Sequence, residues 1–176
     1  MAMPQQVKPV KLLVAILWAD LQALQESRVE LTERYGPIDV EGCDHPFDMT
    51  DYYKDEMGSD LQRRLVAFER LVAPEALVQF KLHCNAIEDK LGRASRRRAN
   101  LDVGYLDHNK LVLASVKYAG QKIHLGQGIY ADMIARYGHG RYQPFEWTFP
   151  DFRDGRYDNE LAAMRSRYLQ QLRDLA

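Results

Sequence analysis

The sequence predicts a single α+β domain. In it, a ferredoxin-like split βαβ antiparallel sheet precedes a C-terminal β-hairpin and a final helix. Three observations support this fold class: apolar runs of strand length alternate with helical periodicity, the first hundred residues follow the order β-α-β-β-α-β, and no linker or fixed-period repeat interrupts the chain. We expect residues 1–10 to be a disordered N-terminal segment and residues 11–176 to form the domain.

The first two elements are well marked. Residues 11–18 read KLLVAILW, a continuous apolar run that predicts a strand buried on both faces. Asp20 then opens a helical pattern that Gly36 and Pro37 end, and residues 38–41 are a short second strand. The predicted apolar face of this helix is Leu21, Leu24, Leu31 and Tyr35.

Residues 61–72 fit a strand or a helix, and we prefer the strand because Pro74 then starts a separate helix cleanly. As a strand, one face carries Leu65, Ala67, Glu69 and Leu71, and the other carries Val66, Phe68 and Val72. The helix that follows ends at Gly92, and its apolar stripe is Leu77, Phe80, Cys84, Ile87 and Leu91.

The rest of the chain begins with a basic connector, residues 93–98. We expect residues 100–105 to form a strand or an extended segment, and residues 111–116 to form either a strand or a helix. Two β-prone segments, 123–137 and 142–149, flank Gly138-His139-Gly140 and predict a hairpin, with Pro144 placing the second at a sheet edge. A last helix over 159–175 has Leu161, Met164, Tyr168, Leu172 and Leu175 on one side.

Composition indicates an ordinary soluble domain. Apolar residues make up 46% of the chain and charged residues 28%, and the formal net charge is -1. That charge supplies no general attraction for nucleic acid or anionic membrane. No apolar run reaches the roughly 20 residues that span a bilayer, and residues 1–10 lack the apolar centre of a signal peptide. With two cysteines, too few for a disulfide framework, we expect a cytoplasmic protein without a membrane partner.

Four acidic-aromatic segments, residues 47–58, 100–106, 128–132 and 147–152, combine carboxylates and aromatic rings with Gly or Pro. This chemistry suits a pocket more than a plain core. If the segments meet, the carboxylates act as acid/base groups or as ligands of a divalent cation such as Mg2+, Lys110 neutralises the ligand and the rings stack. The predicted ligand-binding residues are Asp48, Thr50, Asp51, Tyr52, Asn100, Asp102, Tyr105, Lys110, Tyr130 and Trp147.

Simpler structural roles compete with each of these assignments. Asp48 or Thr50 can cap a helix, and the rings can pack in the core with their hydroxyls bonded to the same carboxylates. Lys117, Arg136, Arg97 and Arg98 are further anion partners, although the arginine run also fits a solvated loop. No zinc spacing and no serine-hydrolase elbow occurs in the sequence, so no catalytic residue and no metal ligand is assigned.

The strings PFDMTDYYKDEMG, NLDVGYL, KLVLASVK, GIYADM and WTFPDF resemble the recurring blocks of a prokaryotic family, domain of unknown function 4416. The resemblance extends from Lys11 to about Leu172; Val103 stands where the family pattern has proline, which affects local turn geometry. Some family members carry a GTP-binding label. This chain has no Gly-x-x-x-x-Gly-Lys-Ser/Thr string, and Gly126-Gln127-Gly128 is only a fragment of a dinucleotide fingerprint.

The leading hypothesis is a protein that binds a polar or anionic small molecule, a nucleotide or phosphorylated metabolite. One alternative is an RNA- or single-stranded nucleic-acid-binding module, although the RNP pattern is absent. Another is a structural domain whose final helix or hairpin edge forms a homo-oligomer. Whether the protein is an enzyme is left open by the sequence.

Overall fold

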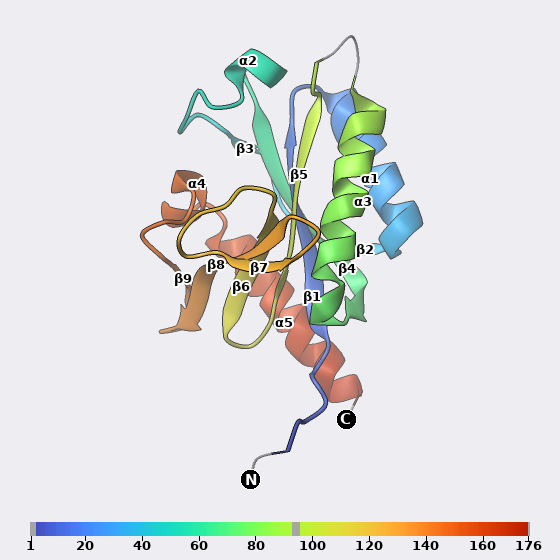
Figure 1. Cartoon of the computed structure of the whole chain (residues 1–176), viewed down its shortest axis with the longest axis vertical. Coiled ribbons are helices and arrows are strands. Elements are labelled where there is room, and N and C mark those ends of the chain that lie inside the picture. The colour runs from blue at the N-terminus through green and yellow to red at the C-terminus, as the bar shows by residue number, and fades with distance from the viewer. Residues whose placement is uncertain (1–2, 93–95, 176) are drawn as a thin grey trace.

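The computed structural model describes residues 3–92 and 96–175 (Figure 1). Within them, one antiparallel sheet of nine strands is flanked by helices, which confirms the α+β class in a single domain. The strands are β1 (Val10–Trp18), β2 (Ile38–Glu41), β3 (His45–Pro46), β4 (Gln62–Val72), β5 (Ala99–Leu106), β6 (Lys110–Ser115), β7 (Ile123–Gly126), β8 (Ile129–Gly138) and β9 (Arg141–Pro144). The helices are α1 (Leu21–Tyr35), α2 (Lys54–Met57), α3 (Leu77–Leu91), α4 (Pro150–Arg153) and α5 (Asp158–Asp174), with a 3-10 turn at Pro74–Ala76 before α3.

The sheet is the middle one of three layers. Its strand order is β2-β4-β1-β5-β6-β8-β7, with β3 paired to β4 and β9 paired to β8. Helices α1 and α3 lie side by side on one face, where Leu24, Leu31 and Cys84 pack against the even-numbered residues of β1. Helix α5 covers the other face through Met164 and Tyr168. Strand β1 is therefore buried along its whole length, as its continuous apolar run predicts.

Helix α1 begins and ends where the sequence predicts. The Asp20 side chain accepts a hydrogen bond from the Ala23 backbone N–H at 2.8 Å, and Gly36 follows the last turn. The prediction that Leu21 faces the core is wrong, because 63% of its surface is exposed. Ser27 takes a buried position instead, with its hydroxyl bonded to the Ala23 carbonyl, so a small polar residue lies where the pattern calls for an apolar one.

The two stretches whose sequences fit either a strand or a helix, residues 61–72 and 111–116, lie mainly in strands β4 and β6. In β4, Leu65 and Ala67 face α5 while Val66 and Phe68 face α1 and α3, which confirms the two predicted faces. Residues 111–116 fall in β6 except for Val116, which lies just beyond the strand. Short apolar runs fit both the helical and the strand period, and here pairing with neighbouring strands makes them strands.

The C-terminal β region holds one strand more than predicted. Residues 123–137 divide into β7 and β8 at a tight turn, where Gln127 and Gly128 adopt positive φ angles of 51° and 74°. The predicted hairpin at Gly138-His139-Gly140 joins β8 to β9 through a second turn of this kind. Pro144 lies in β9, which pairs only with β8 among the described strands, so its predicted edge position is confirmed.

The ends of the chain add two observations. Residues 3–9 contain no helix or strand, β1 starts at Val10, and the Tyr168 hydroxyl donates a hydrogen bond to the Pro9 carbonyl at 3.0 Å. No helix in the described ranges is both long and apolar enough to cross a membrane.

The sheet opens between β5 and β6. The two strands pair only from Gly104 to Leu106, next to the turn that joins them, and they separate beyond Gly104. Helix α3 replaces β6 along this free edge: Glu88 Oε1 accepts the Leu101 backbone N–H at 2.6 Å, and Lys81 Nζ donates to the Leu101 carbonyl at 3.1 Å. The backbone of Leu101 is thus satisfied while the strands leave a gap between them.

Candidate functional site

A cavity of about 300 Å³ occupies the opening between β5 and β6. Its walls come from both strands, from α3, and from the loops that carry residues 52–53, 97, 116–117, 122 and 149. The residues that line it are Tyr52, Tyr53, Lys81, Asn85, Arg97, Asn100, Asp102, Leu113, Ala114, Ser115, Val116, Lys117, Lys122, Asp132, Ile134 and Phe149.

All four acidic-aromatic segments contribute to this lining. The first supplies Tyr52 and Tyr53, the second Asn100 and Asp102, the third Asp132 and the fourth Phe149. Segments far apart in the sequence therefore meet at one cavity, although several of the contributing side chains differ from those that the sequence singles out.

Of the ten predicted ligand-binding residues, Tyr52, Asn100 and Asp102 line the cavity. Asp48, Thr50 and Asp51 are exposed and line a separate hollow of about 250 Å³. The loop divides in this way because Tyr53 turns inward to pack edge-on against Phe47, with ring centroids 5.8 Å apart. Asp48, Thr50 and Asp51 are left outside the cavity.

The other four predicted residues lie elsewhere. Tyr105 packs against the core under α1 and α3, since odd-numbered residues of β5 face that layer. Lys110 pairs with Asp107 at the turn between β5 and β6. Tyr130 contacts the His124 ring, with centroids 5.1 Å apart. Trp147 stacks on Phe145 at 4.6 Å, and its indole N–H donates to the Met133 carbonyl at 3.1 Å.

Four cations line the cavity: Lys81, Arg97, Lys117 and Lys122. Glu88 pairs with both Lys81 and Arg97, and Lys122 Nζ lies 2.9 Å from Ser115 Oγ and 3.4 Å from Asp132 Oδ2. Lys117 differs from these three. In the described part of the chain its ammonium group has no carboxylate partner and lies 4.2 Å from the centre of the Tyr52 ring.

The sequence prediction missed Lys81, Asn85 and Lys122. The sequence pattern could have indicated Lys81, because this residue lies four residues after Leu77 and three before Cys84, inside the apolar stripe of α3. A charged residue in such a stripe is buried only with a partner. No sequence pattern indicates Lys122, since it lies in a loop. The pairing of β7 with β8 brings it beside Asp132.

Two of the lining residues each carry a polar atom that is closed to solvent and has no hydrogen-bond partner among the described residues. The atoms are Nδ2 of Asn100, a residue that is 3% exposed, and Oδ1 of Asp132, a residue that is 7% exposed. Both residues belong to strands, β5 and β8, so their positions are fixed by the sheet. Buried polar groups without partners are uncommon in native proteins and indicate strain, function or an unseen ligand.

Asp102 is held from behind by a buried arginine. Arg63 of β4 donates to Asp102 Oδ2 at 3.0 Å and to Asp151 Oδ2 at 2.5 Å, and the Tyr157 hydroxyl also donates to Asp151. Burial lowers the pKa of Arg63, but the two carboxylates outweigh it and raise the pKa above its usual range. The charged network fixes Asp102 at the wall of the cavity.

Arg98 is buried and Arg97 is partly exposed, and both pair with carboxylates, so the solvated-loop interpretation fits only the exposed Arg96. Arg97 pairs with Glu88 and Glu56, and Arg98 pairs with Asp20 and Glu26. The connector residues 93–95 lie outside the described residues.

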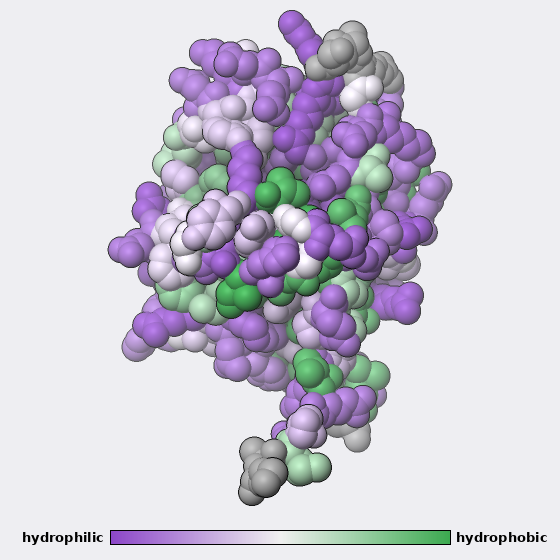
Figure 2. Space-filling model, in the orientation of Figure 1, coloured by the Kyte–Doolittle hydropathy of each residue, from purple (hydrophilic) through white to green (hydrophobic). Residues whose placement is uncertain are grey.

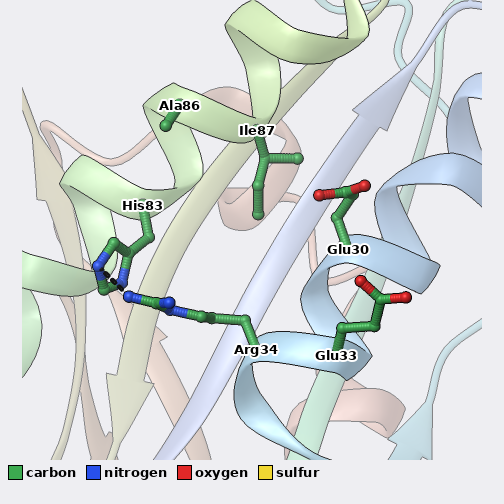
Figure 3. Close-up of a pocket in the computed structure, with 6 residues that line it drawn as sticks. All are labelled: Glu30, Glu33, Arg34, His83, Ala86 and Ile87. Carbon is green, nitrogen blue, oxygen red and sulfur yellow. Dashed lines mark hydrogen bonds between the residues drawn. The ribbon is translucent and has the colours of Figure 1, made fainter.

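A second hollow, about 360 Å³ in volume, lies on the outer surface between α1 and α3 (Figure 3). Arg34 of α1 reaches across it to His83 of α3, where its Nη2 lies 2.6 Å from His83 Nε2, while Glu30 and Glu33 flank the other side. Burial and the nearby Arg34 charge both lower the pKa of His83. Glu30 already pairs with Lys90, and none of the acidic-aromatic segments reaches this groove.

The space-filling view shows a hydrophobic area in the middle of the molecular face drawn in Figure 2, around β6 to β8, with hydrophilic residues on its margins. In β7, β8 and the loops after β6 and before α4, the exposed apolar side chains include Val116, Tyr118, Ile123, Leu125, Met133, Trp147 and Phe149. In the described ranges, no group of three or more His, Cys, Asp or Glu side chains could hold a metal ion.

Comparison with known proteins gives one match. A family model described as Domain of unknown function (DUF4416) matches residues 8–168. No curated protein and no solved structure matches the chain.

Proposed function

The chain belongs to the DUF4416 family, and we propose that it binds an anionic small molecule, a nucleotide or a phosphorylated metabolite, in the cavity between β5 and β6. The observation that carries this proposal is the chemistry of the lining, in which four cations, two aromatic rings of one loop and several neutral polar groups surround one partly enclosed space. Such a mixture of rings and a few placed polar groups is typical of small-molecule sites.

Charge favours an anionic ligand. The lining carries Lys81, Arg97, Lys117 and Lys122 against Asp102 and Asp132. Glu88, behind the wall, compensates Lys81 and Arg97, so Lys117 is the cation that a ligand would neutralise. An ammonium donates up to three hydrogen bonds and suits phosphate or carboxylate oxygens.

The rings suit the flat or apolar part of a ligand. Tyr52 and Phe149 are exposed at the rim of the cavity, whereas Tyr53 is buried in its wall. The volume of about 300 Å³ is at the lower end of the range of about 300–1,000 Å³ that is usual for ligand pockets. A ligand no larger than a mononucleotide fits this size, with part of it outside.

A divalent cation such as Mg2+ would need oxygens from the ligand as well as from the protein. Asp102 and Asp132 are the carboxylates of the lining, and both already face cations, Arg63 and Lys122. Mg2+ is commonly held by one or two carboxylates together with ligand phosphates.

We also interpret β1-α1-β2-β4-α3-β5 as a ferredoxin-like unit, supported by its strand order β2-β4-β1-β5. The nucleic-acid alternative relies on an open sheet face for base stacking. Helix α5 covers that face over β1 and β4, so the small-molecule proposal is the stronger of the two. The expected cytoplasmic location remains part of the proposal and agrees with the two free thiols, Cys43 and Cys84.

One observation favours the interaction-domain alternative. Strand β7 is an edge of the sheet and exposes Ile123 and Leu125, and unpaired edges are templates for strand addition. Sedimentation of the purified protein at several concentrations measures this directly, because edge pairing predicts a dimer.

The proposed binding is tested by calorimetry with inorganic phosphate, AMP, GMP and ribose 5-phosphate, each with and without Mg2+. We expect Lys117→Gln to weaken binding by about tenfold to a hundredfold, because one charge-assisted hydrogen bond contributes about 1.5–3 kcal/mol. Lys54→Gln is the matched control, since Lys54 lines the hollow of Asp48 and Asp51. Absence of binding by the wild-type protein, or weakening by Lys54→Gln alone, contradicts the proposal.

A further inference from the structure

We propose that the cavity takes a zwitterionic ligand, in which an ammonium group meets Asp102 and a phosphate group meets Lys117. This inference rests on the proposed function and names the ligand class for the same cavity, a phosphorylated amine. It is carried by two opposite charges at the cavity that the described residues leave unbalanced.

The negative charge belongs to the carboxylates around Arg63. This single arginine contacts two of them, Asp102 at 3.0 Å and Asp151 at 2.5 Å, and no second cation pairs with either among the described residues. Charged groups that are removed from water are stable only when opposite charges compensate them. The group therefore has one carboxylate more than its own cation balances.

Asp102 is the member of this group that a ligand can reach. Its side chain lines the cavity and is 18% exposed, whereas the side chains of Arg63 and Asp151 are each 1% exposed. Arg63 holds Asp102 through Oδ2. The other oxygen, Oδ1, makes no hydrogen bond with a described residue and is not closed to solvent. The excess negative charge is therefore presented to the cavity at Asp102.

Lys117 supplies the opposite charge at the exposed side of the cavity. It has no carboxylate partner in the described part of the chain, and its ammonium group lies 4.2 Å from the centre of the Tyr52 ring. An anionic group of the ligand is thus expected beside Lys117 and away from Asp102, which would repel it.

The other cations of the lining are already balanced by carboxylates. Two of them share two glutamates, and the third lies 3.4 Å from an aspartate; the groups are Lys81 and Arg97 with Glu88 and Glu56, and Lys122 with Asp132. The two unbalanced charges of the cavity are therefore those of Asp102 and Lys117 within the described residues.

A primary ammonium group suits Asp102 better than a neutral group does. An ammonium supplies the missing positive charge and donates up to three hydrogen bonds to carboxylate oxygens. A hydroxyl donates one hydrogen bond but leaves the charge around Arg63 unbalanced. An aminoalkyl phosphate carries both complementary charges and can interact with Asp102 and Lys117 at once.

The test measures, by calorimetry, the binding of aminoalkyl phosphates against hydroxyalkyl and alkyl phosphates of equal chain length. Several lengths are compared, because the ligand must reach both charged groups. We expect at least one aminoalkyl phosphate to bind about tenfold or more tightly than its hydroxyl and alkyl counterparts, since it gains a charge-assisted hydrogen bond.

We expect Asp102→Asn to remove this preference for the amine while alkyl phosphates bind as they do to the wild-type protein. Asp51→Asn is the matched control, because it removes the same charge from a residue that lines the separate hollow. Thermal unfolding without ligand shows whether both variants are folded, and the comparison of ligands on the wild-type protein needs neither variant.

The outcomes separate this inference from the proposed function. If alkyl phosphates bind but the amine adds nothing, or if the preference survives Asp102→Asn, the ligand class is wrong and the anion site stands. If Mg2+ strengthens the binding of alkyl phosphates through Asp102 and the amine does not, the missing positive charge is a metal ion and the inference fails.

The nucleotides used to test the proposed function complete the comparison. If the wild-type protein binds AMP or GMP but no aminoalkyl phosphate, the inference alone fails. If it binds none of the phosphates, the proposed function fails and this inference fails with it.

Discussion

At the scale of single residues, Arg63 and Arg64 show how neighbours in sequence come to differ. Both are arginines of β4, and each contacts two carboxylates. Successive strand residues point to opposite faces, so Arg63 enters the space between β4 and α4 and is 1% exposed, while Arg64 stays at the surface with Asp44 and Glu41. The sequence alone does not indicate which of the two arginines is buried.

We predict that Arg63→Met destabilises the fold by about 3–5 kcal/mol, because it leaves the buried Asp151 and the partly buried Asp102 without their cation. Arg64→Met should cost about 1 kcal/mol or less, as expected for a surface pair. Urea unfolding of the two variants and the wild-type protein measures the difference. Equal effects of the two substitutions would mean that the buried network contributes no more than the surface one.

At the scale of elements, α1 and α3 contact each other across a groove that the Arg34–His83 contact bridges (Figure 3). Arg34 donates to His83, so the ring nitrogen that faces it must be unprotonated. Each helix was predicted correctly from local signals, but no local signal pairs residue 34 with residue 83. The contact follows from the packing of both helices on β1.

We predict that His83 titrates below its ordinary value of about 6.5 and that Arg34→Met moves its pKa upward. Because the folded-state pKa is lowered, the associated stability is present above about pH 6.5 and is lost as pH falls through the folded-state pKa. An NMR titration of the His83 ring measures its pKa in the wild-type protein and in Arg34→Met. Arg28→Met is the control, since Arg28 lies on the same helix and pairs with Glu41 instead. An unchanged pKa in Arg34→Met would exclude the charge effect.

At the scale of the whole molecule, the short β5–β6 pairing joins the N-terminal half of the sheet to its C-terminal half. Gly104 makes this junction possible. A Cβ atom at this position would lie 2.1 Å from the Val112 carbonyl oxygen and 2.6 Å from Leu113 Cδ2. The absence of a side chain thus allows the strands to approach at one point, next to the cavity.

We predict that Gly104→Ala destabilises the protein by about 1–3 kcal/mol or more, because a backbone atom must move to admit the methyl group. Ligand binding should weaken as well, since β6 carries part of the cavity wall. Gly120→Ala should have little effect, because a Cβ atom at that position would have no neighbour within 4 Å among the described residues. Thermal unfolding and calorimetry measure the two effects, and a wild-type melting temperature for Gly104→Ala would show that the junction is loose.

The sequence by itself determined most elements of this protein and the faces that they bury. Caps such as Asp20 and Gly36, turn residues such as Gly140, and the periods of apolar residues act locally, so they can be recognised without the fold. It also indicated four segments that contribute to the cavity, because their composition differs from that of a plain core.

Only the tertiary structure decided which side chains of those segments enter the cavity. Tyr53 turns inward and leaves Asp48 and Asp51 outside, and Lys81 and Lys122 arrive from elements that carry no acidic-aromatic signal. The physical reason is that the cavity exists where β5 and β6 stop pairing, and α3 rather than a strand satisfies the free edge at Leu101. Which element satisfies this edge of β5 depends on contacts between residues that are distant in sequence, and local periodicity cannot predict such contacts.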